Sequence, residues 1–75
     1  MRLPMVKPRE LIRALKKIGF KEVRQTGSHL ILLNPVAKKI IPVPMHNKDI
    51  KRGLLISIIK HGDLTADEFV KLLQR

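Results

Sequence analysis

The stretch QTGSHLIL, residues 25–32, decides the fold of this chain. It holds a Thr-Gly-Ser turn, followed by a run in which every residue from 30 to 33 is apolar. Glycine supplies the backbone freedom of a tight turn, and a fully apolar run is typical of a strand covered on both faces. The stretch therefore predicts a β-hairpin that turns at residues 26–28 and has His29 at its mouth.

Three antiparallel strands are predicted around this turn, over residues 21–25, 29–34 and 39–43. Val23 is expected to point inward from the first strand. Pro42 and Pro44 cannot donate to a sheet ladder, so the third strand is expected at an edge, paired on one side only. The strand at 29–34 is then the central one.

Alternation along the central strand divides its side chains between two faces. His29, Ile31 and Leu33 fall on one face, and Leu30 and Leu32 fall on the other. If helices cover the second face, His29 lies on an open face among lysine and arginine side chains. An apolar patch rimmed by charge usually marks a protein interface, so Ile31 and Leu33 predict a docking surface beside His29.

Helices are predicted before and after the three strands in the sequence. The first covers residues 8–18, because proline suits the first helical position, apolar residues recur at helical spacing, and Gly19 ends it. A capping box at residues 65–68 begins a short last helix. These elements define an α+β fold, helix, three strands, helix and short helix, in a single domain over residues 1–75.

The helix between these two is predicted to begin at Lys48 or Asp49 and to run to about Lys60. Its predicted apolar face consists of Ile50, Leu54 and Ile58, with His61 as a candidate fourth member. His61 and Gly62 follow, and a histidine at this end suits the helix dipole.

Composition restricts the function. The 75 residues include 16 Lys and Arg against 6 Asp and Glu, a net charge of +10, which favours an anionic partner such as nucleic acid. There is no cysteine, so disulfides and thiolate metal sites are excluded, and the cytoplasm is favoured. The start shows no signal-peptide pattern, and no apolar run approaches the roughly 20 residues of a membrane span, so no membrane role is expected.

His29 is the candidate catalytic residue. Histidine transfers protons near neutral pH, and the 2′-hydroxyl of RNA is a nucleophile that the substrate itself carries. One proton-transfer group with cations to hold the phosphate is therefore sufficient for strand cleavage, without a metal or cofactor. The histidine spacings are not those of a metal site. The alternative is an ordinary strand histidine.

The predicted RNA-binding residues combine the hairpin turn with nearby cations, and they are Gly27, Ser28, Arg24, Lys48, Lys51 and Arg52. Small turn residues let the backbone N–H groups approach a phosphate, and cations at a helix start favour an anion. A solvated helical face is the alternative for those cations. His46 is a possible second proton-transfer or phosphate-binding residue, or else an exposed loop histidine.

The chain resembles the HicA family of toxin ribonucleases in the segments LKKIGF (15–20), GSH (27–29), IPVPMH (41–46), DIKRGLL (49–55) and IIK (58–60). The resemblance extends from residue 8 to about residue 73. It implies a double-stranded-RNA-binding-like fold and mRNA cleavage, with His29 of the Gly-Ser-His motif as the catalytic residue. It also implies a HicB-like antitoxin that masks His29. We expect this antitoxin to contact Ile31 and Leu33 as well. Leu30 stands where many relatives have a polar or histidine residue.

Two other functions fit the same residues. One is a non-catalytic module that binds duplex RNA by shape, through Lys48, Lys51 and Arg52. The other is a ribosome-associated protein that coats RNA with charge, and strong salt dependence without substrate preference would mark it. RNA strand scission distinguishes the toxin from both.

Overall fold

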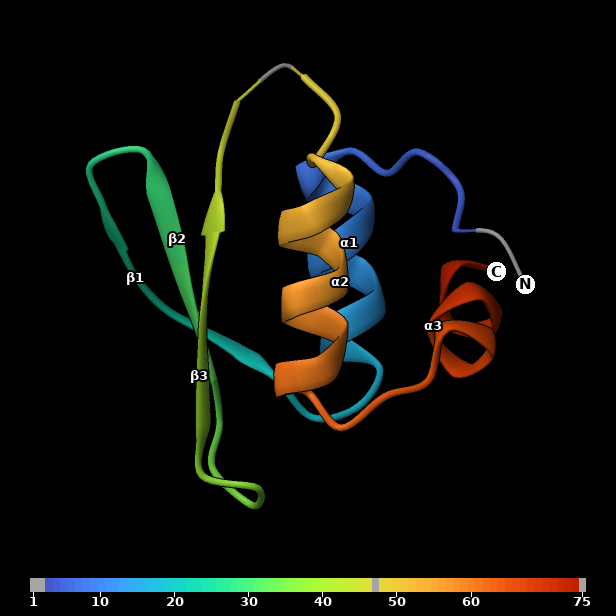
Figure 1. Cartoon of the computed structure of the whole chain (residues 1–75). Coiled ribbons are helices and arrows are strands. Elements are labelled where there is room, and N and C mark those ends of the chain that lie inside the picture. Colours follow the sequence, from blue (N-terminus) through green and yellow to red (C-terminus); the bar gives the residue numbers. More distant parts are fainter. Residues whose placement is uncertain (1–2, 47, 75) are drawn as a thin grey trace.

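The computed structural model describes residues 3–46 and 48–74. Its elements are α1 (Pro8–Lys16), β1 (Lys21–Thr26), β2 (His29–Asn34), β3 (Lys39–Pro44), α2 (Arg52–His61) and α3 (Ala66–Leu73). The predicted α+β class and element order are confirmed. Helices α1 and α2 lie on one face of the sheet, and α3 packs against their far side, away from the sheet (Figure 1). This arrangement is consistent with a double-stranded-RNA-binding-like fold.

The sheet has the order β1-β2-β3 with antiparallel neighbours, so β2 is central as predicted. Thr26 pairs with His29 across a two-residue loop. Leu30 and Leu32 are buried beneath the helices, whereas His29 is exposed. The predicted division of β2 into a covered and an open face is therefore confirmed.

The prolines of β3 lie at positions whose backbone groups face the outer edge of the sheet. The Met45 N–H donates to the Ser28 carbonyl at 2.6 Å, which continues the β2–β3 ladder beyond its last paired residues. Hydrogen-bonded pairs alternate along an antiparallel ladder, so the backbone groups of residues 42 and 44 face outward. With proline at both positions the edge lacks two donors, which opposes pairing with another strand.

Strand β1 departs from the prediction. Val23 is 54% exposed instead of inward-facing, and every residue of β1 is exposed. The pairing with β2 shifts register between Glu22 and Arg24, which is a β-bulge at Val23. The bulge interrupts the alternation of side chains, and the hairpin tip extends beyond the two helices that cover the sheet (Figure 1).

The core lies between the sheet and the helices and continues to α3. Its side chains with less than 2% exposure include Val6, Leu11, Leu15, Leu32, Ile41, Val43, Leu55 and Phe69. Gly19 takes the left-handed conformation expected after helix α1, with a φ of 103°, and the Phe20 N–H returns to the Leu15 carbonyl at 3.2 Å. The helix itself stops at Lys16, before the predicted Ile18.

Helix α2 begins later than predicted. It starts at Arg52, so the predicted start at Lys48 or Asp49 is wrong. The Ile50 N–H explains the difference, because it donates to the Val6 carbonyl at 2.7 Å and ties this residue to the N-terminal segment. Ile50 is buried, as predicted, but it lies outside the helix.

The buried face of α2 also differs by one position. It contains Leu55, Ile58 and Ile59, which follow helical spacing, whereas Leu54 is 40% exposed. The prediction is confirmed for Ile58 and wrong for Leu54. Because Ile50 lies outside the helix, helical spacing does not relate it to Leu54, and the buried face of α2 begins at Leu55.

An ion pair connects the start of β3 to the turn that follows α2. Lys39 Nζ donates to Asp63 Oδ2 and to the His61 carbonyl, each at 2.7 Å. The hydrogen bond from Lys39, followed by its positive charge, holds the pKa of Asp63 below its ordinary value of 3.8; desolvation opposes this shift, and the electrostatic effect of His61 is the least of the four causes.

We expect the Lys39→Met substitution to raise the pKa of Asp63. Because this pKa is lower in the folded than in the unfolded chain, the pair stabilises the fold above the ordinary pKa, and the contribution is lost as the pH falls through the folded pKa. Carboxyl ¹³C NMR titration measures the change, with Lys38→Met as the control. An Asp63 midpoint that is the same with and without Lys39 would contradict this account.

Candidate functional site

Four parts of the chain lie at the same end of the molecule. They are the hairpin loop between β1 and β2, the segment between β3 and α2, and the first turns of α1 and α2 (Figure 1). Both helices therefore direct their N-termini, with the positive end of the helix dipole, toward the end where β2 begins. Most of the predicted site residues lie here.

His29 is exposed and occupies the first position of β2. It pairs with Thr26 on one side and Pro44 on the other, so the central strand fixes its backbone from both neighbours. Ser28 Oγ lies 3.5 Å from His29 Nδ1, at the outer limit of a hydrogen bond. A ring with a firmly held backbone and an exposed edge can reach a substrate laid across this end.

The loop beside His29 depends on its glycine. Gly27 has a φ of 56°, whereas Ser28 has no positive φ. A positive φ at the first of two loop residues is the pattern of a type II′ turn, whose twist matches that of the strands. No atom lies within 4 Å of where a Gly27 side chain would begin, so the turn is also open to an approaching molecule.

Gly27→Ala should destabilise the fold by about 1–2 kcal/mol, because an L-residue is strained at this φ although space is available. Gly53 is the matched control, since it lies within α2 and a side chain added there would also begin with no atom within 4 Å. Gly53→Ala should instead stabilise the fold by about 0.5–1 kcal/mol. Urea unfolding of both variants measures the difference. Equal shifts in the same direction would contradict the strain argument.

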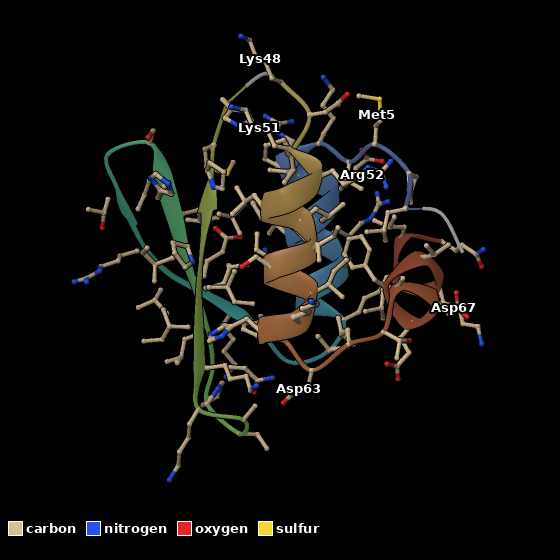
Figure 2. The ribbon with its side chains drawn as sticks, viewed as in Figure 1. Met5, Lys48, Lys51, Arg52, Asp63 and Asp67 are labelled. Atoms are coloured by element: carbon tan, nitrogen blue, oxygen red, sulfur yellow. The ribbon has the colours of Figure 1, made fainter. Side chains whose placement is uncertain are left out.

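The predicted cations gather near the start of α2 (Figure 2). Lys48 lies in the loop before the helix rather than on it, Lys51 is the N-cap, and Arg52 begins the first turn. The Arg52 side chain donates to the Leu3 carbonyl at 3.4 Å, which holds it toward the N-terminal segment. This helix start has no side-chain cap and no acidic residue in its first turn, and the nearby Asp49 is paired with Lys7, so positive charge exceeds negative charge at the positive end of the helix dipole.

Two acidic residues, Asp49 and Glu10, lie at this end and are each engaged with Lys7, and the other acidic residues described lie elsewhere. Asp49, Glu22 and Asp63 form ion pairs with Lys7, Lys16 and Lys39. The Glu10 carboxylate accepts the Lys7 N–H, and Glu68 accepts the Thr65 N–H, so both cap helices. Asp63 and Asp67 lie well away from Lys48 and Lys51 (Figure 2). The end that carries His29 is therefore left with an excess of positive charge.

His46 joins this end through its neighbour Met45. The Met45 N–H bonds to the Ser28 carbonyl, so residues 45 and 28 are fixed to each other directly before His29. His46 Nδ1 accepts the Lys48 N–H at 3.2 Å. His46 is exposed and lies in the loop after β3, while its neighbour Asn47 lies outside the described residues.

The open face of the sheet carries the remaining predicted residues. Ile31 and Leu33 are half-buried, and Arg24 pairs with Ile31 two positions along from His29. Sequence reasoning missed further members of this face, because β3 places Ile40 and Pro42 opposite Leu33 and Ile31. The alternation of residues 40, 42 and 44 would have revealed them once the register was known.

Neither a metal-binding cluster nor a membrane-spanning helix occurs among the described residues. Within residues 3–46 and 48–74, no three histidine, cysteine or acidic side chains come together as a metal-binding group. None of the helices in this part of the chain has the length and apolar character needed to cross a bilayer.

Fold and site together define a small basic α+β protein with an exposed histidine at the end of a three-stranded sheet. The family model described as HicA toxin of bacterial toxin-antitoxin matches residues 8–64, which is more than half of the chain. The chain therefore belongs to the HicA toxin family and is the toxin of a toxin–antitoxin system, which implies an antitoxin partner. No curated protein matched the chain. The family match ends before α3 begins.

Proposed function

We propose that this protein is a metal-independent endoribonuclease that cleaves mRNA in the cytoplasm, with His29 as its proton-transfer residue. The observation that carries the proposal is the exposed His29 beside the open Gly27–Ser28 turn, at the end where lysine and arginine side chains outnumber the acidic ones. Lys48, Lys51, Arg52 and Arg24 attract and hold the RNA backbone, because phosphate contacts by lysine and arginine dominate affinity for nucleic acid.

The reaction needs one bond to form and one to break. The ribose 2′-oxygen attacks the adjacent phosphorus, and the bond from phosphorus to the 5′-oxygen of the next nucleotide breaks. As general base, His29 takes the 2′-hydroxyl proton, and a proton from solvent or a second acid neutralises the departing 5′-oxygen. The Gly27 and Ser28 N–H groups and nearby cations stabilise the charge that builds up on the phosphate. The products are a 2′,3′-cyclic phosphate and a 5′-hydroxyl.

A cleavage assay on an mRNA transcript tests this proposal, with EDTA present and with a DNA of the same sequence as the control. We expect RNA fragments that end in cyclic phosphates and an intact DNA, since DNA lacks the nucleophile. Cleavage of both polymers would exclude the 2′-hydroxyl mechanism. Tight binding of duplex RNA without scission would instead support the non-catalytic module.

The antitoxin is proposed to cover the open face of the sheet and thereby mask His29. Ile31 and Leu33 are half-buried, and Ile40, which pairs with Leu33, is 57% exposed. Apolar side chains of this kind, next to arginine and lysine, suit a partner with an apolar centre and an acidic rim. A HicB-like antitoxin of this character would compete directly with RNA for His29.

Ile31→Asp should weaken antitoxin binding at least tenfold, because it places a carboxylate in the middle of the apolar patch. Titration calorimetry on the His29→Ala background measures the affinity without toxicity. Val36→Asp is the matched control, since Val36 is 92% exposed in the turn at the opposite end of the sheet. Unchanged affinity for the Ile31 variant would show that the antitoxin docks elsewhere.

A further inference from the structure

A hollow of about 360 Å³ lies beside the candidate site, between the start of α1 and the segment that follows β3. Its lining residues are Lys7, Pro8, Arg9, Met45 and His46. The volume falls in the lower part of the range of small-ligand sites, roughly 300–1,000 Å³. The mechanism described above does not use this hollow.

The polar groups of the hollow suit an anionic ligand that also accepts hydrogen bonds. His46 Nδ1 accepts the Lys48 N–H, so the proton of the neutral ring lies on Nε2, which is then a donor. Arg9 is exposed and contributes a permanent positive charge with several donors. Lys7 adds a second cation, although its ammonium group is shared with Asp49 at 3.4 Å.

The apolar groups of the hollow suit a flat ring. Met45 and Pro8 line the hollow together with the polar side chains named above. A methionine sulfur makes favourable contacts with aromatic rings, and Met45 is only half-buried, whereas Pro8 is buried. A ligand that combines an aromatic base with a phosphate meets both halves of the lining.

We propose that this hollow binds one nucleotide of the RNA, with the base against Met45 and the phosphate at Arg9 and the His46 Nε2–H. The proposal rests on the proposed function and extends it to the neighbouring nucleotide. The Met45 N–H bond to the Ser28 carbonyl joins the hollow to the residue before His29. An RNA that crosses this end can therefore contact His29 and the hollow together, so the hollow positions the strand for cleavage.

Methyl NMR of the full-length His29→Ala protein, labelled at its methionine methyl groups, tests the inference. We expect at least one of the four ribonucleoside 5′-monophosphates to shift the Met45 signal in a saturable way, while Met5 stays unchanged. Met5 is 77% exposed and lines a different hollow. Arg9→Gln and His46→Gln should each weaken this binding at least threefold.

Lys60→Gln is the matched control, because it removes one exposed cation at the opposite end of α2 and should leave the binding unchanged. Three results would overturn the inference: a Met45 signal that no nucleotide moves, an equal response to inorganic phosphate alone, or equal weakening by Lys60→Gln. Since the test protein lacks His29, its outcome is independent of catalysis. RNA cleavage with a silent Met45 refutes only the hollow, and a responsive Met45 without cleavage by the wild type refutes only the ribonuclease.

Discussion

His29→Ala should lower the rate of RNA cleavage by between about 100-fold and 10,000-fold, the usual contribution of a positioned proton-transfer group. The fold should be unaffected, since the His29 side chain is exposed at the first position of β2 and supports no buried contact. Single-turnover cleavage of one transcript by matched concentrations of the two proteins measures the ratio. Thermal unfolding of the variant confirms that the loss is chemical.

His61→Ala is the matched control for this experiment. His61 is also exposed, but it ends α2 beside the Lys39–Asp63 pair, away from the hairpin loop. Its removal should leave the cleavage rate within about twofold, because it eliminates a histidine without touching the site. A His29→Ala protein that retains the wild-type rate, or a similar loss in both variants, would remove His29 from the reaction.

Phe69→Ala should have the largest effect on stability, about 3–5 kcal/mol, because its side chain is 0% exposed and leaves a large cavity. This is a large part of the roughly 5–15 kcal/mol that a typical domain possesses. For a chain of this size, the melting temperature should fall by at least about 12 °C. The effect is informative because α3 lies beyond the family match and yet supplies this core residue.

Lys71→Ala provides the control for the contribution of α3. Lys71 lies in the last turn of the same helix and is exposed, so its loss should change the stability by less than about 0.5 kcal/mol. Thermal unfolding followed by circular dichroism compares the two variants. A Phe69→Ala protein as stable as the Lys71 variant would show that α3 is not part of the cooperative fold.

The elements of the fold could be predicted from local signals. Gly19 ends α1, the Gly27 turn forms the hairpin, and the apolar run before Asn34 is the central strand. Each of these depends on backbone freedom or on burial that a short segment reveals by itself. The prolines of β3 likewise identified an edge strand without knowledge of its neighbours.

The errors arose where tertiary contacts overrule a local pattern. The exposure of Val23 follows from a bulge whose position depends on the pairing of β1 with β2. The late start of α2 follows from the hydrogen bond between Ile50 and Val6, which are far apart in the sequence. No periodicity in residues 48–60 shows that bond, so the helix start and the exposure of Leu54 were both missed.

The candidate site was predictable only in part. His29 and the hairpin turn are adjacent in sequence, so their association was evident before the structure. The association with His46 was not, because it requires the bond from the Met45 N–H to the Ser28 carbonyl. The hollow beside α1 was missed for the same reason, since Arg9 and Met45 meet only in the folded chain.

Induced expression of the wild type and His29→Ala in a bacterial host, with growth and mRNA integrity followed together, tests the central claim most directly. We predict that the wild type arrests growth and degrades mRNA, while the variant, at equal protein level, does neither. Arrest by both proteins with intact mRNA would contradict the account and would assign the toxicity to RNA or protein binding rather than to cleavage at His29.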